Sequence, residues 1–189
     1  ENEVAEAFLA TKTKARRDGW QVWANGFWAV FFLIAWFIFE ESVLVIAAYA
    51  AISVAVSDTW ATEIGCRNPG KTVLITSLKK VEPGTDGGIS FKGMVAALAG
   101  ALLIPLLLFP VSNRVDLTVA SVIAISGFAG SLLDSLLGAK FQYQSKDVKR
   151  SENNVLSDEN MNSIINWTAT GFGAVLAIIL TQFLIYEVV

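Results

Sequence analysis

The chain has 189 residues, of which 54% are hydrophobic and only 16% are charged. A soluble domain carries about 25% charged residues, so this composition argues against a water-soluble fold. The sequence has no histidine, which excludes imidazole metal ligands and a histidine general base, and its single cysteine excludes an internal disulfide bond. The net charge of −3 argues against nucleic acid as a partner.

Five apolar stretches in the sequence are each about as long as a membrane span. A helix needs about 20 mostly apolar residues to cross about 30 Å of hydrocarbon. The sequence therefore predicts an all-α membrane protein, with a single transmembrane domain over residues 1–189 and five transmembrane helices. The expected helices cover residues 20–39, 42–62, 93–113, 117–139 and 160–186.

Lysine and arginine residues indicate how the chain crosses the membrane, because they collect in short loops on the cytoplasmic side. Thirteen of the fourteen basic residues precede the first expected helix or fall in two loops, 63–92 and 140–159, and the exception is Arg114. We therefore expect the amino terminus inside and the carboxyl terminus outside. Any single lysine in these loops could also serve only to set this topology and to bind anionic lipid heads.

The first polar motif, Ser57–Gly65, lies at the expected inner end of the 42–62 helix and contains Asp58 and Glu63. An ionised carboxylate at the end of a membrane span is costly and is usually functional. The two residues are five apart, or about 140° around a straight helix, so either the helix breaks between them or each has a different partner. The alternative is an interfacial cap with Trp60 in an aromatic belt. A belt does not require an aspartate, two threonines and a glutamate together.

The second motif is the glycine-rich segment Pro83–Ser90, with two lysines just upstream. Glycines allow backbone N–H groups to turn toward an anion, and nearby lysines add positive charge. The segment also precedes a helix, whose first turn favours phosphate. It is not a Walker A loop, and a simple Pro-Gly turn would look the same. The candidate nucleotide and phosphate ligands are Lys79, Lys80, Gly84, Thr85, Gly87, Gly88 and Ser90.

The third motif, Gly130–Ala139, ends the 117–139 helix and places Ser131, Asp134 and Ser135 on one stripe. Small residues on such a stripe allow close helix packing, which accounts for the motif without any chemistry except at Asp134. That carboxylate needs a cation or hydrogen-bond donors. With Mg²⁺ as its partner, carboxylates, phosphate oxygens and waters would complete the coordination shell.

Amide side chains fall at the same membrane level as these carboxylates. Asn25 lies in the first turns of the first expected helix, while Asn162 and Asn166 lie at the start of the last one. Each asparagine could equally form a hydrogen bond between helices. Together with the carboxylates, they predict a polar pocket that opens to the inner face above a floor of apolar helices.

These motifs resemble the integral-membrane phytyl-phosphate kinase family of the vitamin E pathway, over about residues 12–170. The most specific strings are Asp-Thr-Trp-Ala-Thr-Glu-Ile-Gly at 58–65 and Pro-Gly-Thr-Asp-Gly-Gly-Ile-Ser at 83–90. The other elements that carry the resemblance are 16–26, 130–142 and 162–166. The sequence is also similar in outline to the polyprenol kinases and phosphatidate cytidylyltransferases, which act on lipids with cytidine nucleotides.

The resemblance implies a phosphotransferase of tocopherol biosynthesis, which would transfer the γ-phosphate of a nucleoside triphosphate, with CTP expected, to phytyl or a related prenyl monophosphate. On this hypothesis Asp58 and Asp134 are catalytic and bind Mg²⁺, and Glu63 assists them. The residues expected to bind the acceptor are Arg16, Arg17, Asn25, Asn162 and Asn166. The expected location is a plastid membrane in a photosynthetic eukaryote and the cell membrane otherwise.

The sequence departs from this family in two places. Family members usually have further helices before Arg16, and this chain has Glu82 where the family often has proline. The chain does not begin with methionine and shows no signal peptide, so we expect a transit peptide or a further helix upstream.

Two other functional classes remain open. The first expected helix is aromatic almost all round, so it could face lipid, pigments or a protein partner, as in a non-catalytic membrane subunit of a larger complex. A transporter that uses the two aspartates as a relay is the other alternative. A relay predicts carboxylates near the middle of the membrane, whereas Asp58 and Asp134 lie at expected helix ends.

Overall fold

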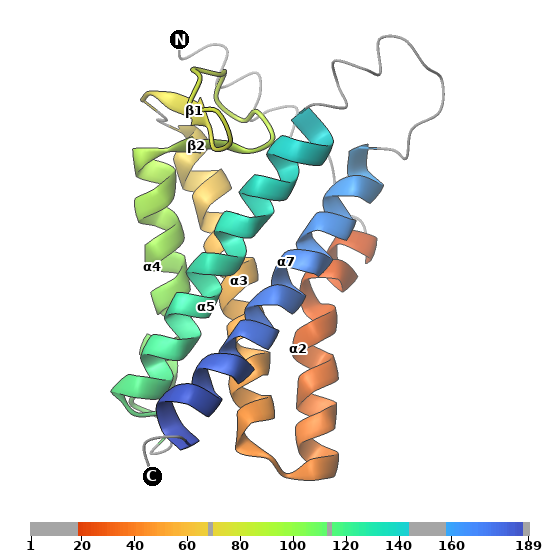
Figure 1. The fold of residues 1–189 in the computed structure, drawn as a ribbon, viewed down its shortest axis with the longest axis vertical. Helices are drawn as coiled ribbons and strands as arrows, with labels where there is room; N and C mark the ends of the chain where they lie inside the picture. Colours follow the sequence, from red (N-terminus) through yellow and green to blue (C-terminus); the bar gives the residue numbers. More distant parts are fainter. Residues whose placement is uncertain (1–18, 68–69, 113–114, 144–157, 187–189) are drawn as a thin grey trace.

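The computed structural model describes residues 19–67, 70–112, 115–143 and 158–186. Within these residues, five helices are long and apolar enough to cross a membrane, which confirms the predicted helical membrane class. They are α2 (Gly19–Phe39), α3 (Ser42–Arg67), α4 (Phe91–Leu108), α5 (Leu117–Leu137) and α7 (Asp158–Thr181). Two of these helices continue into π-helical turns, α5 into Gly138–Tyr143 and α7 into Gln182–Tyr186. Figure 1 shows that the helices run up and down side by side in one bundle.

The central helix is α3, which packs against α2, α4, α5 and α7. Its small residues let neighbouring backbones approach closely, as in other membrane helix bundles. The hydroxyl groups of Ser53 and Ser57 donate hydrogen bonds to the carbonyl oxygens of Ala101 and Ala97 on α4, at 2.9 and 2.8 Å. Gly100 of α4 lies so close that an added Cβ would be 2.9 Å from the Cα of Ser57. These contacts fix α3 and α4 side by side.

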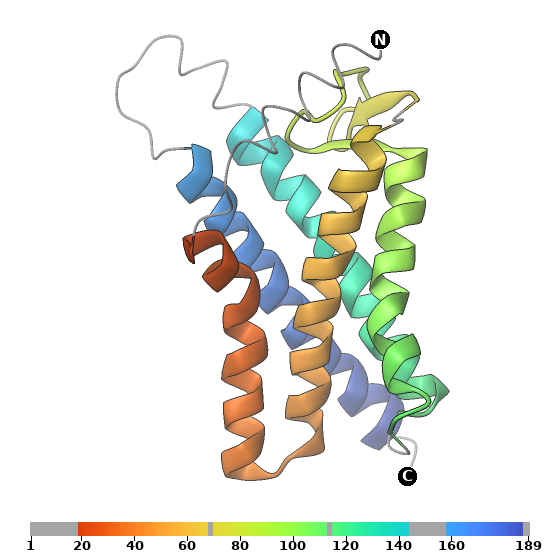
Figure 2. The ribbon, with the colours of Figure 1, turned by 180° about the vertical axis from the view of Figure 1, so that it is seen from behind.

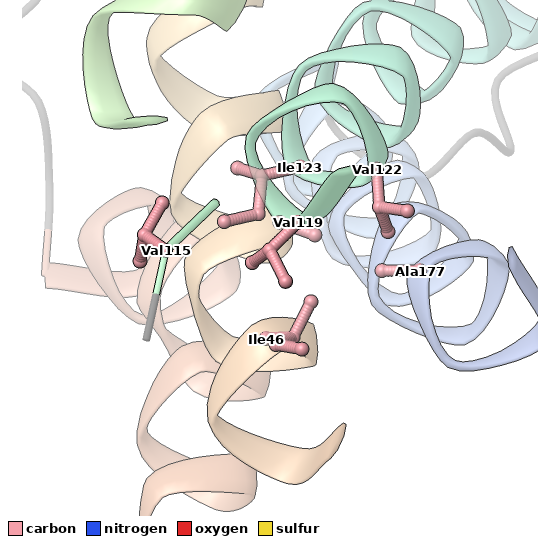
Figure 3. Close-up of a cluster of buried hydrophobic side chains, with 7 residues drawn as sticks. Ile46, Val115, Val119, Val122, Ile123 and Ala177 are labelled. Atoms are coloured by element: carbon pink, nitrogen blue, oxygen red, sulfur yellow. The ribbon is translucent and has the colours of Figure 1, made fainter. Parts of the chain in front are cut away.

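A buried apolar cluster closes one end of the bundle. Figure 3 shows its side chains pointing toward one another from α3, α5, α7 and the segment that precedes α5. The cluster consists of Ile46, Ala50, Val115, Val119, Val122, Ile123 and Ala177. Val122 and Ile123 are fully buried, so this end of the bundle is tightly packed.

A small β-hairpin covers the other end of the bundle, which we call the hairpin end. Strand β1 (Thr72–Leu74) pairs with strand β2 (Gly88–Ser90) in antiparallel fashion, with Thr72 opposite Ser90. Ser90 also caps α4, because its hydroxyl oxygen accepts a hydrogen bond from the amide of Gly93 at 3.1 Å. Figures 1 and 2 both show the hairpin over the ends of α3 and α4 and beside the end of α5.

Basic residues gather at one end of the bundle, whereas acidic residues lie at both ends. Every lysine and arginine in the described part of the chain lies at the hairpin end, on the last turn of α3, the hairpin, the start of α4 or the turn after α5. Glu40, Glu41 and Asp116 lie at the opposite end. The remaining basic positions fall outside the described residues. The side of the membrane on which each end lies stays a prediction.

Candidate functional site

A cavity of about 760 Å³ lies at the hairpin end of the bundle. All five long helices contribute to its wall, and so does the segment that links the two strands. The sequence predicted a polar pocket formed by helix ends and the glycine-rich segment, and the cavity brings these elements together.

Four carboxylates line the cavity: Asp58 and Glu63 from α3, Asp86 from the hairpin and Asp134 from α5. All four residues are half-buried. The α3 helix continues without a break to Arg67, so Asp58 and Glu63 project about 140° apart around its axis. This continuous helix argues against Glu63 sharing one ion with Asp58, and the assisting role of Glu63 stays a prediction.

The linker between the strands is a compact turn that uses two of its own amides. The amide of Thr85 donates to the carbonyl oxygen of Glu82 at 3.2 Å, and the amide of Gly88 donates to that of Thr85 at 2.8 Å. The Thr85 hydroxyl also donates to the Glu82 carbonyl at 2.7 Å. Gly84 and Gly87 have φ angles of 81° and 75°, a conformation that glycine adopts at no steric cost. Within this turn, the amides of Gly84 and Gly87 are therefore better candidates for binding phosphate than the amides of Thr85 and Gly88.

Close contact with the end of α5 holds this turn in place. A Cβ added to Gly87 would overlap both the side chain and the backbone of Ala139. A Cβ added to Gly138 would lie 3.2 Å from the amide nitrogen of Gly87. Glycine at both positions thus allows the turn to approach the helix that carries Asp134.

The structure places most of the predicted site residues on the wall of one cavity. The predicted residues that line it are Asp58, Glu63, Gly84, Thr85, Gly87, Gly88, Ser90, Asp134, Asn25, Asn162 and Asn166. Lys79 and Lys80 do not line it, since both are exposed on the hairpin. Arg16 and Arg17 lie outside the described residues, and so does their predicted contact with the acceptor.

The amide side chains differ in how much of their donor capacity is already used. Asn25 donates from Nδ2 to the carbonyl oxygen of Gln21 at 3.0 Å, within the same helix. That bond leaves one N–H of the Asn25 amide group for a ligand. Asn166 is buried and Asn162 half-buried in the cavity wall.

Sequence reasoning missed several polar contributors to the cavity, among them Asp86 and Thr72. Asp86 lies inside the glycine-rich motif, and it was not predicted as a site residue because a carboxylate is not an expected ligand of phosphate. Thr72 lies on β1 and reaches the cavity because it pairs with Ser90 on β2. The strands have three residues each, which is too short for a reliable alternating pattern.

The charge of the cavity wall favours a cation. Four carboxylates line it, while no lysine or arginine of the described part of the chain does. A phosphate group would meet this negative wall at a cost unless a cation accompanied it. Among the described residues, no three acidic or cysteine side chains are grouped closely enough to hold a metal ion. A pair of carboxylates still suits Mg²⁺, which binds one or two of them together with waters and substrate phosphates. The assignment of Mg²⁺ to Asp58 and Asp134 stays a prediction.

The fold and the cavity define a polytopic membrane protein with a polar, acidic site at one end of a five-helix bundle. The sequence profile of the family described as "Integral membrane protein DUF92" matches residues 1–179. The chain therefore belongs to this integral membrane family.

Three curated relatives come from an archaeon, a plant and a cyanobacterium. "Uncharacterized membrane protein MJ0933" of Methanocaldococcus jannaschii is 32% identical over 159 residues, which are 84% of this chain and 60% of the relative. "Protein PGR" of Arabidopsis thaliana is 36% identical over 96 residues, which are 46% of this chain and 33% of that protein. "Uncharacterized membrane protein sll0875" of Synechocystis is 29% identical over 147 residues, which are 75% of this chain and 56% of the relative.

The matches span between a third and three fifths of the length of these relatives. No solved structure matches the chain.

Proposed function

We propose that the cavity at the hairpin end is the active site of a membrane phosphotransferase that converts a prenyl monophosphate to the diphosphate. The donor would be a nucleoside triphosphate, with CTP expected from the resemblance to phytyl-phosphate kinases. The observation that carries this proposal is the presence of Asp58 and Asp134, from two different helices, and the glycine-rich turn on one cavity.

The position of the cavity suits a reaction between an amphiphilic acceptor and a water-soluble donor. A prenyl chain gains about 0.8 kcal/mol per buried CH₂ by entering the bilayer, while its phosphate remains at the aqueous edge. The cavity lies where five apolar helices meet a polar hairpin. A nucleotide from water and a phosphate on a lipid chain could therefore meet there.

The proposed reaction transfers one phosphoryl group between two phosphates. An oxygen of the prenyl phosphate forms a bond to the γ-phosphorus, and the bond from that phosphorus to the β–γ bridging oxygen breaks. The products are prenyl diphosphate and a nucleoside diphosphate. Because the attacking oxygen already carries negative charge, no general base is needed, which agrees with a chain that has no histidine.

Positioning and charge neutralisation are the main requirements of such a transfer. Asp58 and Asp134 would hold Mg²⁺, which would neutralise charge on the phosphate oxygens. The amides of Gly84 and Gly87 would orient the donor phosphates, and Asn162 and Asn166 would donate hydrogen bonds to the acceptor phosphate. Each of these residues lines the cavity.

A product assay tests the proposal. Purified protein in lipid nanodiscs receives phytyl or geranylgeranyl monophosphate, Mg²⁺ and one of CTP, ATP or UTP, and mass spectrometry resolves the products. We expect prenyl diphosphate and nucleoside diphosphate in equal amounts, with neither formed when EDTA replaces Mg²⁺. A folded protein that forms no prenyl diphosphate with any of the three nucleotides would overturn the proposal.

A further inference from the structure

A second cavity, which we call the α2 groove, lies along the outer face of α2. It has a volume of about 390 Å³, and all of its lining residues belong to α2, from Val22 to Ile34. The wall is made of valine, isoleucine, glycine and aromatic side chains. Trp23 and Phe31 are 44% and 47% exposed, and Val30 is 56% exposed, so the groove faces away from the bundle.

Two parallel rows of side chains form the groove, because residues four apart on a helix lie above one another on its surface. An aliphatic row and an aromatic row line it: Val22–Gly26–Val30–Ile34 and Trp23–Phe27–Phe31. The ring centroid of Phe27 lies 4.8 Å from that of Trp23 and 6.1 Å from that of Phe31, so the aromatic row is a continuous wall. Gly26 interrupts the aliphatic row, and a Cβ added there would meet no atom within 4 Å.

The α2 groove is continuous with the polar cavity. Val22 and Gly26 line both of them. From Val22 to Ile34 the groove extends about 18 Å along the helix, at about 1.5 Å per residue. One ligand could therefore place a polar head in the cavity and an apolar chain along α2.

We propose that the α2 groove binds the hydrocarbon chain of the acceptor, a linear isoprenoid monophosphate, and that Gly26 is the opening through which this chain leaves the polar cavity. This inference rests on the proposed function. Lipid tails are as apolar as the groove, so hydrophobic transfer gives little selectivity between them. Selectivity comes from the fit of a branched chain between the aromatic row and the gap at Gly26, through many small dispersion contacts.

A side chain at position 26 should block the groove without disturbing the fold. Gly26→Leu places a Cβ where no other atom lies within 4 Å, and leucine favours the helix. Gly19→Leu is the matched control, since Gly19 is also in α2, also has open space around it, and lines neither cavity. We expect Gly26→Leu to raise the KM for geranylgeranyl monophosphate by about tenfold or more and to raise the KM for dimethylallyl monophosphate far less, because the shorter chain does not extend along the groove. Gly19→Leu should leave both values unchanged.

Photolabelling locates the chain directly. Geranylgeranyl monophosphate with a diazirine at the far end of its chain is photolysed with the protein in phosphatidylcholine nanodiscs, and adducts are mapped by mass spectrometry. We expect adducts near Val30, Phe31 and Ile34 that excess unlabelled geranylgeranyl monophosphate suppresses and that Gly26→Leu reduces about tenfold. Adducts confined to other helices, or adducts that no competitor suppresses, would overturn the inference.

The same samples separate this inference from the proposed function. If the protein forms no prenyl diphosphate but shows competed adducts along α2, the proposed function fails and the groove assignment stands. If the protein forms prenyl diphosphate while the competed adducts lie on other helices, the proposed function stands and the groove assignment fails.

Discussion

At the hairpin end of the bundle, α3 and α5 present Asp58 and Asp134 to a cavity of about 760 Å³. At the opposite end, the same two helices contribute Ile46 and Ile123 to a closed apolar cluster. The two ends share helices, but at the hairpin end polar groups of the described residues surround a cavity, whereas at the opposite end apolar side chains pack together. Tight packing stabilises the bundle at the apolar end, and the candidate site lies at the hairpin end.

The two ends of α5 show the same contrast, because each end carries an aspartate. Asp116 caps the start of the helix, because its carboxylate accepts a hydrogen bond from the amide of Val119 at 2.8 Å. Asp134 lies near the other end of α5, four residues before the π-helical turn begins at Gly138. Capping explains Asp116, whereas Asp134 lines the cavity in which the proposed cation would bind.

The largest expected effect is on activity and comes from neutralising the Asp134 carboxylate in the cavity. Asp134→Asn should lower phosphate transfer about a thousandfold, or about 4 kcal/mol of transition-state stabilisation, because cation binding is lost. Asp116→Asn is the matched control on the same helix and should keep full activity, since asparagine also caps helices. Wild-type product formation by a folded Asp134→Asn protein would contradict the metal assignment.

Substitutions at the apolar end should lower the stability of the protein instead of its activity. Ile123→Ala removes a fully buried side chain and should lower the free energy of unfolding by about 3 kcal/mol. Ile125→Ala, on the same helix but 55% exposed, should change it far less. Unfolding in detergent measures both variants. Equal losses for the two would show that the cluster in Figure 3 is not the packed core.

A smaller effect, on nucleotide binding, is expected from a change where the hairpin contacts α5. Gly87→Ala adds a side chain that overlaps Ala139 and forces alanine into a positive φ, so nucleotide binding should weaken about tenfold. Gly70 also has a positive φ, of 62°, but has open space around it. Gly70→Ala therefore imposes similar backbone strain without the overlap. If the two variants bind nucleotide equally well, the contact with α5 does not position the turn.

The smallest expected effect tests the attachment of α4 to α3. Ser57→Ala removes the hydrogen bond to Ala97 and should cost about 0.6 kcal/mol of stability, as is common for hydrogen bonds between membrane helices. Ser121→Ala removes only a bond to Leu117 within its own helix and is the control. Unfolding free energies in detergent distinguish them, and a loss confined to Ser121→Ala would contradict the assigned contact.

The helices could be predicted from the sequence because apolar runs of membrane length have few other structures open to them. Their ends were less certain: α3 continues to Arg67, beyond the expected end at 62, and α4 stops at Leu108, before the expected end at 113. A helix can include the polar residues at the edge of the membrane or end before them, and hydropathy does not distinguish these outcomes.

The site was predictable where residues belong to helices and less so in the hairpin. Asp58 and Asp134 follow apolar runs, so their membrane level followed from counting residues along each helix. Lys79 and Lys80 lie close in sequence to the glycine-rich turn, but the hairpin places them outside the cavity wall. The pairing of Thr72 with Ser90 joins two strands of three residues each, which are too short to reveal their register in advance.

The most direct test of the central claim is a double-mutant cycle on Asp58 and Asp134, with Mg²⁺-dependent CTP binding as the measurement. If the two carboxylates hold one cation with the nucleotide, each aspartate-to-asparagine change alone should weaken binding strongly, and the double variant should bind about as weakly as either single variant. Losses that add in free energy, or a single variant that binds as the wild type does, would contradict a shared cation site.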